Sequence, residues 1–172
     1  MKRLTLSEIT NLAEIVGTIA IVVSLIFVGL QIRQNTRQIE AASYQTGITF
    51  IDAVNNLATN PDSAGLIIKG LQDFDALTKV EKARFDGRLY NVMNKFFLAR
   101  QVYLQGSLSR EVYETYEDLL ARLMRSPGAA LWWAKTKYII PDDIKSVIDG
   151  IVERYADIEP MSDYYNFAHK PQ

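Results

Sequence analysis

Cysteine is absent from this chain of 172 residues, and histidine occurs only once, as His169. Without cysteine the chain has no disulfide, no thiolate nucleophile and no Cys-ligated zinc or iron–sulfur site. A single histidine close to the end of the sequence argues against Ser–His nucleophile systems. It also argues against the carboxylate-bridged metal centres of helical bundles, which use Glu-x-x-His pairs. We therefore expect no metal and no cofactor.

Excess positive charge and phosphate-binding motifs are missing as well. The net charge is −1 and the pI is about 5.9, so the chain lacks the positive field that drives non-specific nucleic-acid binding. Neither G-x-x-x-x-G-K-[ST] nor G-x-G-x-x-G occurs in the sequence. Carboxylate-dependent acid–base chemistry stays open, because Asp and Glu together number 20 and their pKa values depend on their surroundings. We favour a protein that is not an enzyme and has no nucleic-acid partner.

Charge is also missing from residues 15–32, between Glu14 and Arg33. A helix over this stretch is about 27 Å long, which suits the hydrocarbon core of a bilayer. The sequence therefore predicts one transmembrane segment over residues 12–32, with membrane lipid as a partner.

Two other interpretations of this apolar stretch are weaker. Lys2 and Arg3 before it resemble the start of a signal peptide, but Glu8, Asn11 and Glu14 intervene and no Ala-x-Ala-like cleavage site follows. A buried helix of a soluble core is seldom uncharged over such a length. A retained anchor is the favoured interpretation.

Orientation depends on the basic residues at the two ends of the span. Lys2 and Arg3 on one side balance Arg33 and Arg37 on the other. Because the second pair abuts the apolar boundary and acidic residues dilute the first, we favour a cytoplasmic C-terminal domain.

The rest of the chain predicts an all-α fold, since no stretch shows the alternation of a half-buried strand. Caps and breakers predict a long helix from near Ser7 to near Ala58, which is the transmembrane segment plus a cytoplasmic extension, followed by a small helical bundle. The expected shorter helices run from about 60 to 71, 78 to 104, 110 to 125, 127 to 138 and 141 to 155. The expected organisation is an N-terminal tail (1–11), a transmembrane segment (12–32), a continuation of the long helix (33–58), a helical domain (59–158) and a C-terminal tail (159–172).

Small residues recur on one side of the predicted span, where they allow transmembrane helices to approach closely. We predict self-association of the protein through Gly17, Ala20 and Ser24.

Beyond the span the same side of the helix carries amides, at Gln31, Asn35 and Gln38. Buried amides suit a water-filled lumen or an amide-bonded interface of an oligomer, whereas exposed amides simply face solvent. All three environments stay open. Further on, Phe50, Val54 and Leu57 form an apolar stripe that we expect to dock on the helical domain or on a neighbouring subunit.

Two features of the helical domain can be interpreted either as functional or as ordinary parts of the core and the surface. Trp132 and Trp133 are either core residues or an aromatic interface for a flat ligand or for lipid headgroups. The acidic residues of the 110–125 helix are expected to face solvent, opposite an apolar face. The acidic set is Glu111, Glu114, Glu117 and Asp118, and the apolar set is Val112, Tyr116, Leu119, Leu120 and Leu123.

A resemblance emerges from the run LIFVGLQIRQNTR at residues 25–37, which is followed by AASYQ at 41–45. Together with Gly106-x-Leu108 and Ser126-Pro-Gly128 before the two tryptophans, it resembles a large group of uncharacterised bacterial single-span membrane proteins. The resemblance implies bacterial origin and membrane anchoring, and it assigns no catalytic residue.

These observations predict a non-enzymatic, single-pass protein of the bacterial inner membrane that forms a homo-oligomer. Its helical domain would serve assembly, as a scaffold, or bind a protein partner. Two alternatives are an oligomeric pore with an amide-lined lumen and, less favoured, a carboxylate-dependent enzyme.

Overall fold

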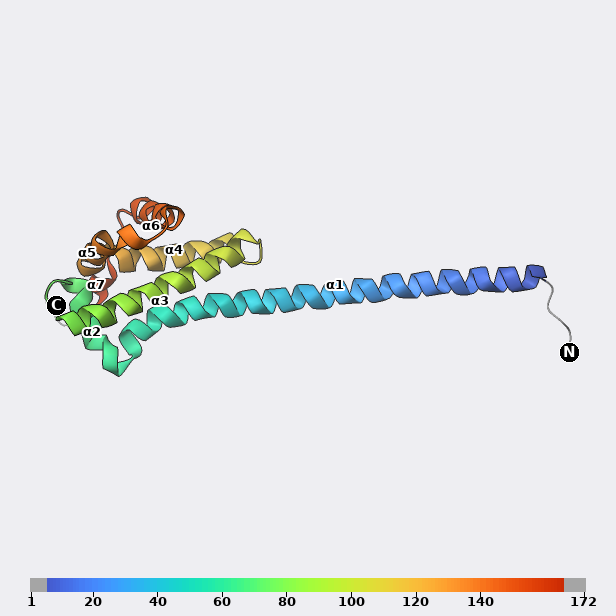
Figure 1. Ribbon diagram of the computed structural model, residues 1–172, viewed down its shortest axis with the longest axis horizontal. Coiled ribbons are helices and arrows are strands. Elements are labelled where there is room, and N and C mark those ends of the chain that lie inside the picture. Colours follow the sequence, from blue (N-terminus) through green and yellow to red (C-terminus); the bar gives the residue numbers. More distant parts are fainter. Residues whose placement is uncertain (1–5, 166–172) are drawn as a thin grey trace, which may run out of the picture. The chain divides into compact units, whose positions relative to one another are not determined.

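The computed structural model describes residues 6–165, apart from the side chains of Glu8, Ile9, Glu40 and Ser43. Over this range the chain is helical and contains no strand, which confirms the all-α prediction of a long first helix followed by a bundle. The elements are α1 (Leu6–Thr59), α2 (Pro61–Gln72), α3 (Lys79–Leu104), α4 (Arg110–Arg125), α5 (Pro127–Thr136), the 3-10 helix η1 (Lys137–Ile139), α6 (Asp142–Arg154) and α7 (Met161–Tyr164), as Figure 1 shows.

Local capping determines where these helices begin and end. Asn60 caps α2 by accepting a hydrogen bond from the Asp62 amide at 3.0 Å, and Ser109 caps α4 through the Val112 amide at 3.3 Å. Gly106 follows α3 with a φ of +74°, a conformation that glycine adopts without strain. The predicted helix limits therefore lie close to the observed ones.

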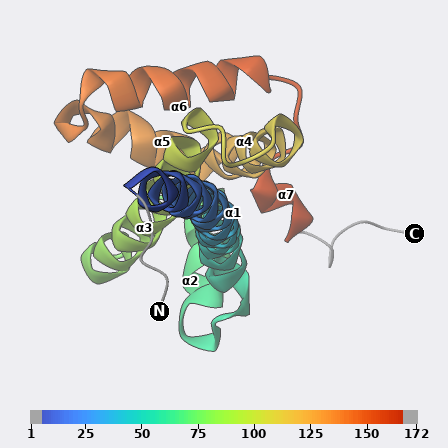
Figure 2. The same ribbon diagram turned by 90° about the vertical axis from the view of Figure 1, so that its right-hand side faces the viewer.

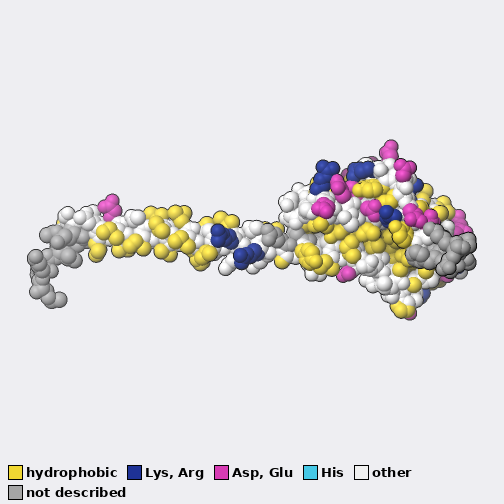
Figure 3. Space-filling model, turned by 180° about the vertical axis from the view of Figure 1, so that it is seen from behind, with side chains coloured by type: hydrophobic (Ala, Val, Ile, Leu, Met, Phe, Trp, Pro, Cys, Tyr) yellow, Lys and Arg dark blue, Asp and Glu magenta, His cyan; other side chains and the backbone are white. Residues whose placement is uncertain are grey.

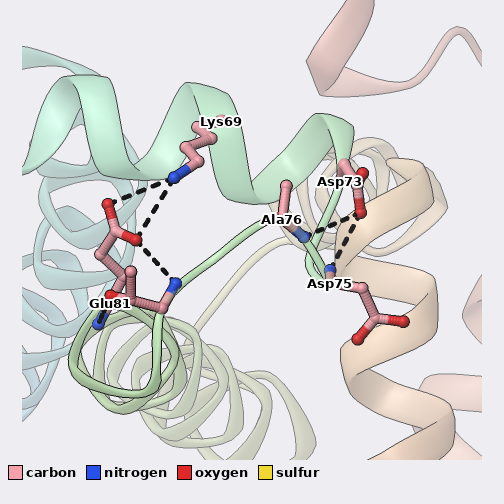
Figure 4. Close-up of polar contacts among 6 residues, drawn as sticks. Lys69, Asp73, Asp75, Ala76 and Glu81 are labelled. Atoms are coloured by element: carbon pink, nitrogen blue, oxygen red, sulfur yellow. Dashed lines mark hydrogen bonds and ion pairs between the residues drawn. The ribbon is translucent and has the colours of Figure 1, made fainter.

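The connection from α2 to α3 is closed by a capping box (Figure 4). The Glu81 carboxylate accepts a hydrogen bond from the Thr78 amide at 2.7 Å, and the Thr78 hydroxyl accepts one from the Glu81 amide at 3.3 Å. Lys69 of α2 lies 3.3 Å from the same carboxylate. In the turn before it, the Asp73 carboxylate accepts hydrogen bonds from two successive backbone amides, at 2.9 and 3.2 Å.

The chain divides into two compact units, residues 1–42 and residues 43–172. The first unit contains the N-terminal part of α1, in which residues 6–11 of the expected tail are already helical. Helix α1 includes Arg33, Tyr44 and all residues between them without a turn, as predicted. The second unit contains the end of α1 and all the other helices, and every buried hydrophobic residue of the core belongs to it.

The core of the second unit is built around the apolar stripe at the end of α1. Phe50, Val54 and Leu57 are buried, so their predicted docking on the helical domain is confirmed. The Phe50 ring contacts Phe96 of α3 at 5.7 Å and Tyr116 of α4 at 5.2 Å between centroids. Within this unit α4 packs against α3, α5, α6 and α7, and α2 packs against α3, α5 and α7 (Figures 1 and 2).

The packing of α4 corrects its predicted apolar face. Tyr116, Leu120 and Leu123 are buried as expected, but Val112 is 38% exposed. Because α4 contacts four other helices, its buried surface is broader than the predicted stripe. The additional buried residues are Tyr113, Glu117, Ala121 and Met124.

The end of the domain also differs from the prediction. Met161 and Ser162 of α7 are buried, and the Ser162 amide donates a hydrogen bond to the Ser126 hydroxyl at 3.0 Å. The domain therefore extends past the predicted boundary at residue 158, at least to Tyr164. Pro160 begins a new short helix, which packs on α2 and α4.

Candidate functional site

The N-terminal unit presents a largely apolar surface. Large apolar side chains between Leu12 and Ile32 are exposed on α1, and Figure 3 shows hydrophobic atoms along one face of this segment. Its most apolar window has a mean hydropathy of 2.5 and no buried residue. Within the described part of the chain, α1 alone is long and apolar enough to cross a membrane. A buried core helix, one alternative for this stretch, does not fit this exposure.

The small-residue face (Gly17, Ala20 and Ser24) lies on this exposed helix. Spacings of three and four residues place its members on one side. The Ser24 hydroxyl donates a hydrogen bond to the Ala20 carbonyl at 2.8 Å, so it is satisfied within the helix. A Cβ built at Gly17 meets no neighbouring atom within 4 Å. This face is shallow and has its polar group paired, which suits close approach by another helix.

The amide face (Gln31, Asn35 and Gln38) follows on the same helix, and all three residues are exposed. Arg33 and Arg37 lie between these positions and are exposed too. Polar amides and two guanidiniums therefore follow directly on the apolar segment, as expected where a helix leaves a bilayer.

Trp132 and Trp133 are both core residues of the second unit, with exposed fractions of 0% and 6%. Their indole nitrogens donate hydrogen bonds to Asp86 at 2.8 Å and to Asp149 at 2.7 Å. Of the two interpretations left open for these residues, their burial supports core residues and not an aromatic interface. Adjacent residues on α5 are both buried because α2 and α4 contact that helix.

The acidic residues of α4 are mostly paired with arginines. Glu114 lies 2.7 Å from Arg110, one turn earlier in the same helix. Glu117 is only 5% exposed and pairs with Arg154 of α6, so the expectation that it faces solvent is wrong. Since Arg154 is 37 residues away, no local pattern could have indicated this pair. Asp118 pairs with Arg122 at 2.8 Å.

A cavity of about 310 Å³ opens between α3, α4 and α6, entirely within the second unit. We call it the arginine pocket, because Arg100, Arg110 and Arg154 all line it. The carboxylates of Glu114 and Glu117 line it as well. The sequence analysis missed this pocket, because its charged groups come from three helices with no shared motif.

Burial raises the pKa of the Tyr113 hydroxyl, which lies at this pocket, and the nearby Glu117 carboxylate raises it further. The Arg100 guanidinium opposes this increase without cancelling it. Tyr113 therefore stays protonated at neutral pH and can donate a hydrogen bond.

Residues 6–165 contain no group of three or more His, Asp or Glu side chains that could hold a metal ion. His169, the one histidine, lies outside these described residues.

No family model, curated protein or solved structure matches this chain. The resemblance to bacterial single-span membrane proteins stays a prediction, and the function has to be argued from the exposed apolar helix and from the helical domain.

Proposed function

We propose that this protein is a membrane-anchored, non-enzymatic protein that associates with copies of itself through α1. The observation that supports the proposal is the exposed apolar surface of residues 12–32. Monomeric soluble proteins rarely expose contiguous apolar patches of more than a few hundred Å². A bilayer covers such a helix on every side, which a single groove on a partner protein does not.

Self-association follows from the small-residue face of this helix. In a bilayer there is no hydrophobic driving force between helices, so their association depends on close packing. Gly17, Ala20 and Ser24 allow that approach, and the internally bonded Ser24 hydroxyl adds no unpaired group. The helical domain then serves as a scaffold for assembly or for binding a protein partner.

The proposed location is the bacterial inner membrane, crossed once, with the helical domain in the cytoplasm. The bacterial origin rests on the resemblance of residues 25–37, and the orientation rests on Arg33 and Arg37 at the end of the span. The apolar segment equally satisfies the length and composition of a signal sequence, so the first experiment distinguishes retention from cleavage.

Intact mass spectrometry of the protein purified from membranes tests the anchor. We expect a mass that includes residues 12–32, and we expect the protein to stay in the membrane pellet after alkaline washing. The matched control is a variant with Ile19→Arg and Val23→Arg, since each arginine near the centre of the span disfavours insertion by about 2.5–3.5 kcal/mol. A mature chain that begins after Gly29 would refute the anchor.

Cysteine crosslinking tests self-association, and the absence of native cysteine makes single introduced cysteines unambiguous. Gly17→Leu or Ser24→Leu should reduce crosslinked dimers formed through a cysteine at Asn35, because the larger side chain separates the helices. Ile26→Leu is the control, because residue 26 lies on the side of the helix opposite Gly17 and the substitution conserves side-chain volume. A monodisperse monomer in mild detergent, with no crosslinks in native membranes, would contradict the proposal.

A pore is the second candidate, and the exposed amide face favours it. In an oligomer around a wet axis, Gln31, Asn35 and Gln38 would replace hydrogen bonds of water or ions. Single-channel recording in planar bilayers tests it, with Asn35→Leu expected to reduce the conductance. Absence of channels from crosslink-competent oligomers would leave the scaffold as the function.

A further inference from the structure

The arginine pocket of the second unit carries an excess of one positive charge. Its three guanidiniums face two carboxylates, and two of the three are already paired. Arg110 lies 2.7 Å from Glu114, and Arg154 lies 2.5 Å from Glu117. The charge that is left is that of Arg100.

Arg100 is half-buried on α3 and forms no ion pair with a carboxylate of the described residues. Within the pocket the Tyr113 hydroxyl interacts with both the Arg100 guanidinium and the Glu117 carboxylate. Because a carboxylate only accepts, the Tyr113 hydroxyl donates its proton to Glu117, and Arg100 is the charged donor left for a ligand. A planar guanidinium fork fits a carboxylate or phosphate by two parallel hydrogen bonds.

Apart from Ser146, the remaining walls of the pocket are formed by apolar and aromatic residues. Tyr103 stacks on Tyr113 with 4.2 Å between ring centroids and 3° between ring planes, and both residues line the cavity. Val147 and Ile151 of α6 form the facing wall. Gly150 lies between them in sequence, and a Cβ built there meets no atom within 4 Å, so the cavity is open at that point.

We infer that the arginine pocket binds a small monoanion, a carboxylate attached to an apolar body, with the acid group on Arg100. The apolar body lies between the Tyr103 ring and the α6 wall. One net positive charge balances one carboxylate and leaves a dianion uncompensated. The volume of about 310 Å³ is at the lower end of the range of small-molecule pockets, which restricts the ligand to a compact acid.

Benzoate and its neutral isostere benzamide are suitable probes, because they share the apolar ring and differ in charge. Ligand-observed NMR on the full chain in a zwitterionic detergent measures the binding of each. We expect saturable benzoate binding and, for benzamide, an affinity lower by about tenfold or more, since hydrogen bonds to a charged group are stronger than neutral ones. Absence of saturable benzoate binding up to about 10 mM, or equal affinity for both probes, would overturn the inference.

Two variants locate the binding site. Arg100→Gln removes the unpaired charge and should weaken benzoate by about tenfold with little effect on benzamide. Gly150→Leu places a side chain in the open cavity and should abolish the binding of both probes. Gly65→Leu is the matched control, because Gly65 is also helical with open space at its Cβ but does not line the pocket.

The outcome of these variants decides between the pocket and non-specific uptake by the micelle. Benzoate that binds Arg100→Gln as tightly as the parent protein would refute the inference, whatever the behaviour of Gly150→Leu. Normal binding by Gly65→Leu together with loss in Arg100→Gln would support it. The crosslinking of α1 does not enter this test, so the result is independent of the proposed self-association.

Discussion

Gly128 lies in the first turn of α5, where that helix packs against α2. A Cβ at this position would overlap the backbone carbonyl of Gly70, and a Cβ at Gly70 would in turn overlap the Phe85 ring. Gly128 thus allows the α5 backbone to contact the α2 backbone, and Gly70 leaves room for the Phe85 side chain of α3, whereas Gly65, on the same helix as Gly70, faces open space. Two glycines five positions apart on α2 therefore differ in their surroundings, since Gly70 is in close contact with a neighbour and Gly65 is not.

Replacing Gly128 by alanine should destabilise the second unit by about 1–3 kcal/mol, because the new methyl group meets rigid backbone. Gly65→Ala, by contrast, should stabilise it by about 0.5–1 kcal/mol, since alanine has the higher helix propensity. Chemical unfolding followed by tryptophan fluorescence measures both, because Trp132 and Trp133 are buried. Equal midpoints for the two variants would show that the α2–α5 contact adjusts freely.

The Arg154–Glu117 pair is another contact whose partners have unequal burial. The Glu117 side chain is almost fully buried, whereas that of Arg154 is 61% exposed. Arg154→Ala leaves a buried carboxylate without its partner and should lower stability by about 1–3 kcal/mol, with water replacing part of the interaction. Glu117→Gln should lower it less, since a neutral amide replaces the charge.

The control for this pair is Arg110→Ala. Arg110 and Glu114 are both exposed, and such pairs contribute at most about 1 kcal/mol. The same unfolding assay ranks the three variants. If Arg110→Ala were as destabilising as Arg154→Ala, burial of Glu117 would not be the reason for the loss.

At the scale of the elements, the α2–α3 connection is held by charge as well as by the capping box. The Thr78 amide, then its hydroxyl and then Lys69 lower the pKa of Glu81. In the same connection, Lys135 of α5 and then Lys82 of α3 lower the pKa of Asp75. These contacts tie three helices to one turn, which is where Figure 4 is centred.

The lowered pKa of Glu81 predicts how stability depends on pH. A carboxyl group with a lower pKa in the folded state stabilises above its unfolded value, about 4.3, and loses that effect as the pH falls through the folded pKa. In Glu81→Gln the new side chain can still complete the capping box, but it does not titrate. We therefore expect unfolding midpoints of Glu81→Gln to decline less than those of the parent protein as the pH falls below about 4.3.

Carbon NMR of the Glu81 carboxyl gives a direct check on this pH dependence. Its midpoint should lie below the ordinary glutamate range in the folded protein. Parallel stability curves for the parent protein and Glu81→Gln over this interval would exclude the contribution of this group.

At the scale of the whole molecule, the apolar span and the hydrophobic core belong to different units. All buried core residues have numbers of 50 or higher, and the exposed apolar segment ends at residue 32. A fragment of residues 43–172 should therefore be a folded, water-soluble protein that no longer sediments with membranes. Circular dichroism and vesicle flotation check both properties.

A shorter fragment, residues 61–172, is the control for this experiment. It lacks Phe50, Val54 and Leu57, which are buried in the core, so we expect it to be unstable or aggregated. Flotation of the 43–172 fragment with vesicles would show that the helical domain binds lipid by itself and would contradict this expectation.

The helices and their ends could be predicted from the amino-acid sequence, because Asn60, Thr78, Ser109 and the proline and glycine breakers act on backbone groups a few residues away. The uncharged apolar segment could likewise be predicted, since absence of charge over residues 15–32 is a property of the chain alone, whereas its exposure came from the structure. The four-residue helix α7 escaped prediction because it is too short to show a periodic pattern.

Which side chains are buried in the core, and which line the arginine pocket, depends on how the helices pack. Trp132 and Trp133 are both core residues because α2 and α4 pack against α5, and Glu117 is paired because α6 brings Arg154 to it. The arginine pocket needs α3, α4 and α6 together. Contacts between residues dozens of positions apart follow from how helices pack, and a local sequence pattern carries no information about that arrangement.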